Sequence, residues 1–370
     1  MTKAEERAAA QTLVAAIAEA AAGVKRQLRF MEVCGTHTVS IFRAGIRQLL
    51  PDNVELVSGP GCPVCVTPDD YMDKAIAYAS HPDVIVTTFG DMLKVPGTRS
   101  SLGAAKTEGA DIRIVYSPMD SLQIARDNPN KKVVFLAVGF ETTAPTAAAT
   151  VLAAEQAGIG NLYMLSAQKL VPPAMRALLD DPEVQVDGFI LPGHVAVVTG
   201  VAAFRFLETE YHLPGVVTGF EPLQILRSLA RLTRQAAAGE ARVENEYGSV
   251  VHEDGNPTSR AICERVYEAV DSRWRGLGII PRSGLAMRAE YADRDIEHVL
   301  PLAPGEVPPA KKTACRCGDV LRGVVKPTEC PLFGKACTPT HAVGPCMVSV
   351  EGVCAAWYKY GRASFQFGQA

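Results

Sequence analysis

Residues 28–38 read LRFMEVCGTHT, and this stretch sets the pattern that decides the fold. The apolar run at 28–33 predicts a buried strand, and the polar turn at 34–38 follows it directly. The same order of short β-branched run, polar turn and Ala- or Leu-rich helical stretch repeats as far as Phe220. Such alternation is typical of βαβ units, which build parallel sheets. The chain is therefore expected to have an α/β fold.

The repeats contain eight candidate strands, which suggest two Rossmann-like parallel-sheet halves of four strands each, facing a cleft. The strands are expected at residues 28–33, 54–58, 84–88, 112–116, 133–138, 162–166, 189–191 and 216–218. A turn-rich stretch at 127–130 marks a boundary between the halves, and a long helix is expected at 222–238. We therefore expect a first α/β domain with an N-terminal helix at 1–127, a second at 128–222, and a cysteine-rich domain at 223–370.

Composition and charge exclude two classes of partner. The 370 residues carry a formal net charge of −3, with Lys and Arg spread along the chain, so no concentrated positive field is available for nucleic acid. No run of about 18 apolar residues is present, which excludes a membrane helix. The Ala-rich N-terminus contains Glu5, Glu6 and Glu19 and lacks the apolar core of a signal peptide. We expect a cytoplasmic protein that binds neither nucleic acid nor membrane.

The ten cysteines indicate metal binding or redox chemistry, because the cytoplasm keeps structural thiols reduced. Cys34, Cys62 and Cys65 lie early in the chain, and Cys263 stands alone. Six more fall between residues 315 and 354. This distribution predicts two separate sites.

Polar motifs follow five of the predicted strands, at residues 34–38, 59–65, 89–92, 139–145 and 192–194. Each motif alone could be an ordinary turn between a strand and a helix, since Gly and Thr are common there. In open parallel sheets, however, ligands bind at the carboxyl ends of the strands. Five motifs at the same kind of edge favour one shared cleft between the two halves.

Cys34 is a candidate metal ligand, because Gly35 permits close backbone approach and the next residues offer hydroxyls and an imidazole. A buried cysteine that acts as a small hydrophobic residue is the alternative. His37 is equally compatible with a role in the site and with satisfying backbone groups.

Cys62 and Cys65 form a C-x-x-C pair, a spacing that can close a disulfide or bind a metal. Thr67 and Pro68 read as the start of a helix, whose positive end should lower the pKa of at least one thiol. Zinc usually needs two further ligands with similar spacing, and none lies nearby. Redox activity is therefore favoured.

Four C-terminal cysteines fit a tetrahedral zinc ion or a 4Fe-4S cluster. Their spacings of six, eight and seven residues lack the close pairs usual for zinc and differ from the compact bacterial ferredoxin run, so the cluster is favoured. Cys315 and Cys317, just upstream, could be alternative ligands or free thiols. The four candidate ligands are Cys330, Cys337, Cys346 and Cys354.

Together these motifs resemble the HypD family of hydrogenase maturation proteins over nearly the whole chain. The resemblance is carried by CGTHT at 34–38, GPGCPVC at 59–65, TFGDM at 88–92, GFETTAP at 139–145, PGHV at 192–195, CPLFGKACTP at 330–339 and GPCMVSVEGVCAAWY at 344–358.

The resemblance implies a scaffold rather than a conventional turnover enzyme. With a small partner, HypC, it would hold iron while cyanide arrives from the HypE–HypF pathway and carbon monoxide is added, giving the Fe(CN)2CO centre of NiFe-hydrogenase. Cys34 would bind that iron, Cys62 and Cys65 would be a redox pair, and the four C-terminal cysteines would hold a 4Fe-4S cluster. The groups that orient ligands in the site would be Thr36, His37, Glu141, Thr142 and His194.

Two other functions are weighed against this scaffold. An iron–sulfur-dependent thiol–disulfide reductase would need only the C-x-x-C pair and the cluster, and it leaves Cys34 and the Glu141–Thr142 motif without a role. A nucleotide-binding enzyme would need a phosphate loop, and neither G-x-x-x-x-G-K-[ST] nor a well-placed G-x-G-x-x-G is present.

Overall fold

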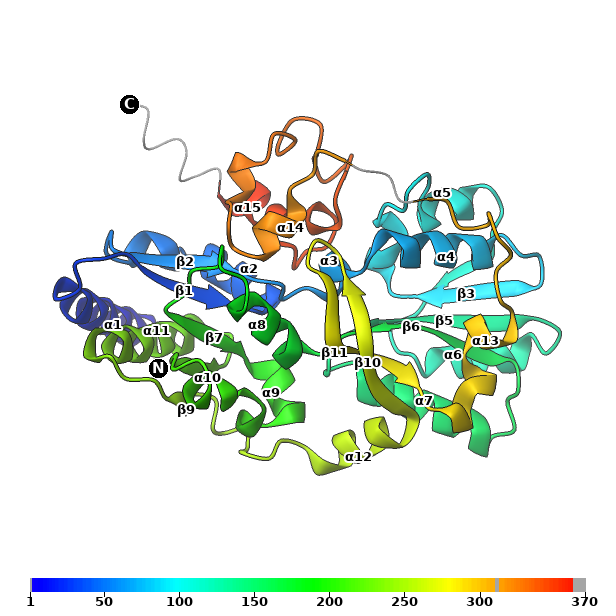
Figure 1. Ribbon diagram of the computed structural model, residues 1–370, viewed down its shortest axis with the longest axis horizontal. Helices are drawn as coiled ribbons and strands as arrows, with labels where there is room; N and C mark the ends of the chain where they lie inside the picture. The colour runs from blue at the N-terminus through cyan, green and yellow to red at the C-terminus, as the bar shows by residue number, and fades with distance from the viewer. Residues whose placement is uncertain (1, 310–312, 362–370) are drawn as a thin grey trace.

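The computed structural model describes residues 2–309 and 313–361 and contains two parallel sheets covered by helices, an α/β fold (Figure 1). The first sheet has the order β2-β1-β7-β8-β9, and the second has the order β4-β3-β5-β6. The first comprises β1 Leu28–Glu32, β2 Val54–Ser58, β7 Gly188–Pro192, β8 Gly215–Thr218 and β9 Val243–Asn245. The second comprises β3 Val84–Thr88, β4 Ile112–Ile114, β5 Lys132–Gly139 and β6 Leu162–Gln168.

All eight expected strands are present, and their neighbours in each sheet run parallel. The ninth strand, β9, was not expected because its three residues carry no apolar run. The first sheet therefore has five strands rather than four.

The strands do not divide between the sheets at residues 127–128, where the sequence was expected to divide. β3 and β4 join β5 and β6, whereas β7 and β8 return to β1, with Met31 opposite Phe189. The physical reason is that the buried strand β1 hydrogen-bonds along both of its edges. It pairs with β2 on one side, and β7 returns to cover the other side. Alternation along the chain predicts that strands exist but carries no information on their order.

The helices cover the faces of both sheets, and the expected helix at 222–238 is confirmed as α11. Pro222 begins α11, and Gly239 ends it in the left-handed conformation, with φ 67°. Ile225, Leu229 and Leu232 follow at helical spacing and pack on the first sheet. β9 is a strand of the first sheet, and α11 packs on the same sheet. Residues 222–245 are therefore part of the first half, and not of the C-terminal domain expected at 223–370.

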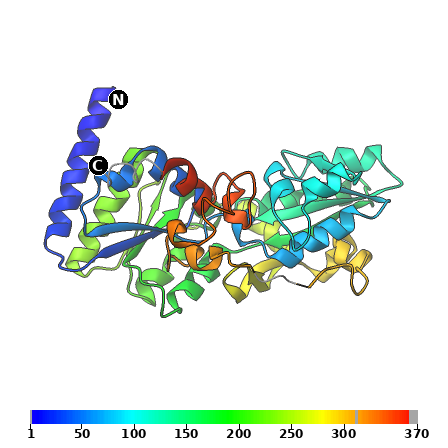
Figure 2. The ribbon, with the colours of Figure 1, turned by 90° about the horizontal axis from the view of Figure 1, so that it is seen from above.

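The other α-helices are α1 Lys3–Ala22, α2 Gly35–Arg43, α3 Pro63–Val66, α4 Asp69–Ala79, α5 Leu102–Thr107, α6 Asp120–Asp127, α7 Ala144–Gln156, α8 Val171–Leu179, α9 Gly193–Thr199, α10 Phe206–Thr209, α12 Pro257–Val266, α13 Ile296–Val299, α14 Cys317–Leu321 and α15 Val353–Tyr360. Short 3-10 helices lie at Ile46–Leu49, Gly90–Lys94, Val201–Phe204, Ala289–Arg294, Pro327–Glu329 and Pro345–Met347. Helix α1 packs against α11 and projects beyond the first sheet (Figure 2).

A hairpin of β10 Tyr267–Trp274 and β11 Gly278–Met287 crosses the middle of the molecule (Figure 1). Its β11 strand touches the second sheet, where Ser166 Oγ donates a hydrogen bond to the carbonyl of Leu285 at 2.8 Å. At its tip, the Arg275 N–H donates to the carbonyl of Val66 at 2.8 Å, and Gly276 packs against Gly318. The hairpin therefore joins the second sheet, the loop after β2 and the C-terminal segment.

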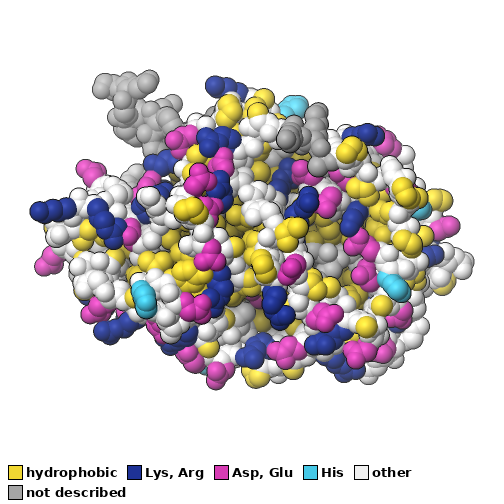
Figure 3. Space-filling model, in the orientation of Figure 1, with side chains coloured by type: hydrophobic (Ala, Val, Ile, Leu, Met, Phe, Trp, Pro, Cys, Tyr) yellow, Lys and Arg dark blue, Asp and Glu magenta, His cyan; other side chains and the backbone are white. Residues whose placement is uncertain are grey.

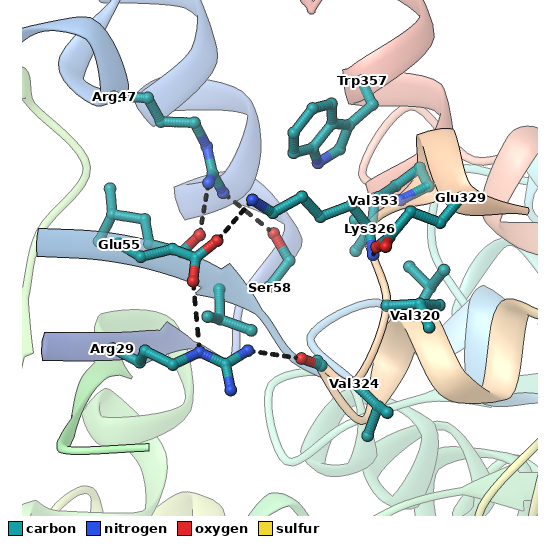
Figure 4. A pocket seen from close by; sticks show the side chains of 15 residues that line it. Arg29, Arg47, Glu55, Ser58, Val320, Val324, Lys326, Glu329, Val353 and Trp357 are labelled. Carbon is teal, nitrogen blue, oxygen red and sulfur yellow. Dashed lines mark hydrogen bonds and ion pairs between the residues drawn. The ribbon is translucent and has the colours of Figure 1, made fainter. Parts of the chain in front are cut away.

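Residues 313–361, called the C-terminal segment below, are held to the edge strand β2 by a network of ion pairs (Figure 4). Lys326 Nζ lies 2.8 Å from Glu55 Oε1, and Arg29 Nε lies 3.3 Å from Glu55 Oε2. Arg29 also donates to the carbonyl of Gly323 at 2.9 Å. These contacts place the cysteine-rich residues above the junction of the two sheets (Figure 1).

Charges of both signs are interspersed over the face of the molecule seen in Figure 3, in keeping with their even spread along the sequence. Within residues 2–309 and 313–361, no helix has the length and apolar character needed to cross a bilayer.

The loop after β2 lies directly against the end of β1. The Gly35 N–H donates to the carbonyl of Gly61 at 2.9 Å. A Cβ on Gly61 would lie 2.2 Å from the backbone nitrogen of Cys34 and 2.4 Å from its Cα. No side chain fits at Gly61 without moving the Cys34 backbone.

Replacing Gly61 with Ala should therefore lower the free energy of unfolding by about 1–3 kcal/mol, the usual cost of overpacking a rigid site. Chemical denaturation followed by circular dichroism measures the change. Gly160→Ala is the matched control, because no atom lies within 4 Å of its added Cβ, and it should leave the unfolding midpoint unchanged or slightly raised. Equal midpoints for both variants would contradict the contact.

Candidate functional site

A cavity of about 270 Å³ lies where the carboxyl ends of the two sheets meet. In the first sheet it adjoins the ends of β1 and β7, and in the second the ends of β3 and β5. Each pair flanks the point where the strand order reverses, which is where open α/β sheets bind ligands. This cavity, called the cleft below, confirms the expectation of a cleft between the two halves. Its polar walls include Cys34, Thr36, Thr142, Thr143, His194 and Glu351.

Cys34 follows the end of β1 by two residues and is the N-cap residue of α2, and it is 9% exposed. Burial raises the pKa of the Cys34 thiol to about 12, although the backbone N–H groups of His37 and Thr36 favour the thiolate. The thiol therefore stays protonated when nothing is bound. A bound metal cation would displace that proton, since coordinated thiols are deprotonated. The site suits a metal ligand better than a free nucleophile.

Thr36 connects the cleft to the C-terminal segment. Its Oγ1 donates to Glu351 Oε1 at 2.7 Å. A Cβ on Gly35 would lie 2.5 Å from Cβ of Glu351, so only glycine admits this approach. Glu351 was not among the residues that the sequence singled out. The signal that could have found it is a single carboxylate among the small and apolar residues between Cys346 and Cys354.

His194 lines the cleft, whereas His37 is fully buried behind it. Phe220 lies between the two imidazoles, with ring centroids 4.0 Å from His194 and 4.7 Å from His37. Nε2 of His37 lies 2.9 Å from the carbonyl of Gly219, and burial lowers the pKa of His37 to about 4. A neutral His37 that donates from Nε2 therefore holds the stack in place rather than facing a ligand.

Glu141 lies behind the wall that Thr142 and Thr143 form. Its Oε1 accepts the N–H of Val171 at 2.8 Å, which satisfies a donor at the start of α8. Burial raises the pKa of Glu141 to about 7. The structure thus brings Thr142 into the cleft and directs Glu141 toward a helix end.

Cys62 is the N-cap residue of α3 and Cys65 lies within this helix, and the two residues are 2% and 0% exposed. Their Sγ atoms are 2.7 Å apart, so a disulfide needs little movement. Gly61, Pro63 and Val64 line the cleft, whereas the two thiols lie beneath it. The following helix, α4, begins at Asp69 with Pro68 as N-cap, and burial raises the pKa of Cys65, opposite to the effect expected of a helix start.

Six cysteines of the C-terminal segment line one small cavity, called the cysteine cavity below. They are Cys315, Cys317, Cys330, Cys337, Cys346 and Cys354. Among the described residues, no group of three or more His, Cys, Asp or Glu side chains is arranged to hold a single metal ion. A four-iron cluster spreads its ligands farther apart than one ion does, and a set made only of thiols is the donor set it takes.

The cysteine cavity adjoins the C-x-x-C pair. Helix α3 packs against the 3-10 helix Pro345–Met347, so Cys65 and Cys346 lie in one buried cluster, and the neighbouring thiols of Cys317 and Cys65 lower the pKa of Cys346. Two groups of cysteines far apart in the sequence therefore meet at Cys346, whose thiolate form is favoured, as a metal ligand requires.

The pH dependence of stability should report the buried carboxyl of Glu141. A glutamate has an ordinary pKa of 4.5 and about 7 here, so the folded state holds the proton more tightly than the unfolded state. Its contribution is complete below pH 4.5 and is lost as pH rises through 7. From pH 5 to 8, Glu141→Gln should gain up to about 3 kcal/mol in free energy of unfolding relative to wild type.

Denaturant unfolding at several pH values measures this gain. Glu155→Gln, an exposed position on the neighbouring helix α7, is the control and should follow the wild-type pH dependence. A difference between Glu141→Gln and wild type that stays constant from pH 5 to 8 would show that the carboxyl is not perturbed.

Comparison with known proteins identifies the family. The family model described as HypD, "Hydrogenase formation hypA family", matches residues 8–361. Hydrogenase maturation factor HypD of Escherichia coli strain K12 is 48% identical over 337 residues, which cover 91% of this chain and 90% of that protein. The factors of the same name from Azotobacter vinelandii and Cupriavidus necator are 46% identical over 362 residues and 45% identical over 357 residues. These alignments cover 96% and 94% of this chain, and 95% and 94% of the respective relatives. The chain therefore belongs to the HypD family of hydrogenase maturation factors.

Proposed function

We propose that this chain is a cytoplasmic scaffold that holds one iron in the cleft during assembly of the Fe(CN)2CO centre of NiFe-hydrogenase. The observation that carries the proposal is the Cys34 thiol at the meeting point of both sheets, surrounded by Thr36, Thr142 and His194. A HypC-type chaperone would complete the site. HypE, with HypF upstream, would deliver cyanide.

In this proposal the iron is cargo, and the chain's own residues hold and shield it. Cys34 loses its proton on binding iron, and a single thiolate leaves positions open for diatomic ligands and for a ligand from the partner. The hydroxyls of Thr36 and Thr142 and the imidazole of His194 can hydrogen-bond to those ligands. Apolar side chains on the opposite wall, including Phe89 and Met92, limit access of water.

Cys62 and Cys65 would supply reducing equivalents, since oxidation of two thiols to a disulfide releases two electrons and two protons. Cys330, Cys337, Cys346 and Cys354 would hold a 4Fe-4S cluster, which when bound supplies single electrons. The packing of α3, which carries Cys65, against the 3-10 helix that carries Cys346 supports this arrangement.

The same contact is what an iron–sulfur-dependent thiol–disulfide reductase would use, and this is the second candidate function. Such a reductase needs neither the cleft nor Cys34. Scaffold and reductase are therefore separated by what binds at Cys34.

Cys34→Ala should remove the iron-bound cyanide and carbon monoxide, because the cleft loses its thiolate. Infrared spectroscopy of the variant purified with its HypC-type partner should show these bands reduced by at least about tenfold relative to wild type. The C-terminal iron and sulfide content should stay unchanged. Cys263→Ala, in α12 outside both cysteine groups, is the control with normal bands. Bands of wild-type intensity in Cys34→Ala would refute the ligand assignment.

Anaerobic reconstitution should load four iron and four sulfide per chain, about as expected for one cubane cluster. Cys337→Ser, which removes a buried thiol of the cysteine cavity, should lower this content severely and destabilise the C-terminal segment. Mössbauer spectroscopy identifies the cluster type. Stoichiometric zinc without sulfide would instead establish a zinc site.

A further inference from the structure

Three hydroxyl groups and one imidazole line the cleft, and they differ in whether a proton is free to be donated. They belong to Thr36, Thr142, Thr143 and His194. A hydroxyl has one proton to donate and two lone pairs that accept. A hydroxyl whose proton already bonds to the protein therefore presents only lone pairs to a ligand in the cleft.

The proton of the Thr36 hydroxyl is already used. A carboxylate only accepts, so the 2.7 Å bond between Thr36 Oγ1 and Glu351 Oε1 takes the proton of Thr36. Glu351 is held in turn, because its N–H donates to Ser349 Oγ at 3.3 Å and that hydroxyl donates to Asp91 Oδ2 at 3.4 Å. The Thr36–Glu351 side of the cleft thus offers side-chain acceptors and no side-chain donor.

The proton of the Thr143 hydroxyl is used as well. Thr143 Oγ1 donates to the carbonyl of Phe140 at 3.1 Å. The same oxygen lies against the end of β5, where a Cβ on Gly139 would be 1.6 Å from it. Thr143 therefore packs against the backbone rather than offering a proton to a ligand.

Thr142 and His194 have free donors. Within the part of the chain that the structure describes, the Thr142 hydroxyl and the ring nitrogens of His194 make no hydrogen bond. His194 is held instead by stacking on Phe220, with ring centroids 4.0 Å apart, which leaves its N–H available. Thr142 follows β5 of the second sheet, and His194 follows β7 of the first. One free donor therefore faces the cleft from each sheet.

The two kinds of diatomic ligand need different neighbours. Iron-bound cyanide is anionic, and its nitrogen accepts hydrogen bonds strongly, whereas the oxygen of iron-bound carbon monoxide accepts them weakly. Besides burial, the negative charge of Glu351 raises the pKa of Cys34, so this charge is felt where the iron would bind. A cyanide nitrogen is therefore stabilised beside Thr142 or His194 and disfavoured beside the Thr36–Glu351 pair.

We propose that Thr142 and His194 distinguish cyanide from carbon monoxide: each donates one hydrogen bond to the nitrogen of one iron-bound cyanide, and Thr36 donates to neither. The inference rests on the proposed function, because it needs iron at Cys34. Two free donors correspond to two cyanides, and carbon monoxide takes a position without a side-chain donor. Thr36 can still accept a hydrogen bond from an N–H of the partner.

Infrared spectroscopy of the full-length chain, purified with its HypC-type partner, tests the assignment. Because the two cyanide stretches couple, the quantity to compare is the mean wavenumber of the two cyanide bands. A hydrogen bond at the cyanide nitrogen raises this wavenumber, so Thr142→Val and His194→Phe should each lower it. The double variant should lower it by about the sum of the two shifts. Valine keeps the shape of threonine, and phenylalanine keeps a ring to stack on Phe220.

Three kinds of variant serve as controls. Thr146→Val makes the same change one helical turn along α7, at an exposed position outside the cleft, and should give the wild-type wavenumber. Thr142→Ser and His194→Gln keep a donor and should restore the wavenumber. Thr36→Val should keep the wild-type mean wavenumber in the iron that remains bound, because Thr36 gives no proton to cyanide.

Wild-type wavenumbers in both Thr142→Val and His194→Phe, or an equally large shift in Thr36→Val, overturn the inference and leave the scaffold function standing. Loss of all bands in Thr142→Val and His194→Phe supports the donor role if Thr142→Ser and His194→Gln recover them, and overturns it if they do not. Absence of cyanide bands from the wild-type complex would instead overturn the proposed function.

Discussion

The pairing of β7 with β1 is the constraint on which the rest of the structure depends. Because β1 lies between β2 and β7, the chain leaves the first sheet after β2, builds the whole second sheet, and then returns. The carboxyl ends of β1 and β7 therefore face those of β3 and β5, and the polar motifs that follow these strands meet. Cys34 and His194 thus face Thr142 across one cleft although they come from three separate turns.

Much of this fold could be predicted from the sequence, because apolar runs and turn chemistry are local. All eight expected strands and α11 lie where the pattern places them. The strand order could not be predicted, because it depends on which strands pair across long separations in the sequence. The pairing of β7 with β1 is the example. The meeting of Cys34, Thr36, Thr142 and His194 followed from the edge rule for parallel sheets. His37 and Glu141 lie one layer behind the cleft because their side chains bond to the Gly219 carbonyl and the Val171 N–H.

The C-terminal segment supplies a part of the cleft wall that the two sheets do not form. It inserts Glu351 beside Thr36 at the cleft and packs the helix of Cys346 against that of Cys65, while Lys326 fixes its other side to Glu55. These contacts join residues some 300 positions apart in the sequence, as with Thr36 and Glu351 at a separation of 315. No local pattern could predict them. Gly35 was the visible trace, because a side chain at this position would collide with Glu351.

The interrupted first sheet also has a consequence for the order in which the protein forms. The second sheet is built from one continuous segment, β3 to β6, and can close as soon as Gln168 has been synthesised. The first sheet must wait for β7 and β8, and the cleft for Glu351, near the end of the chain. Contacts of such long sequence separation form late and slowly. During translation, Cys34 therefore has no completed pocket around it until almost the whole chain has emerged.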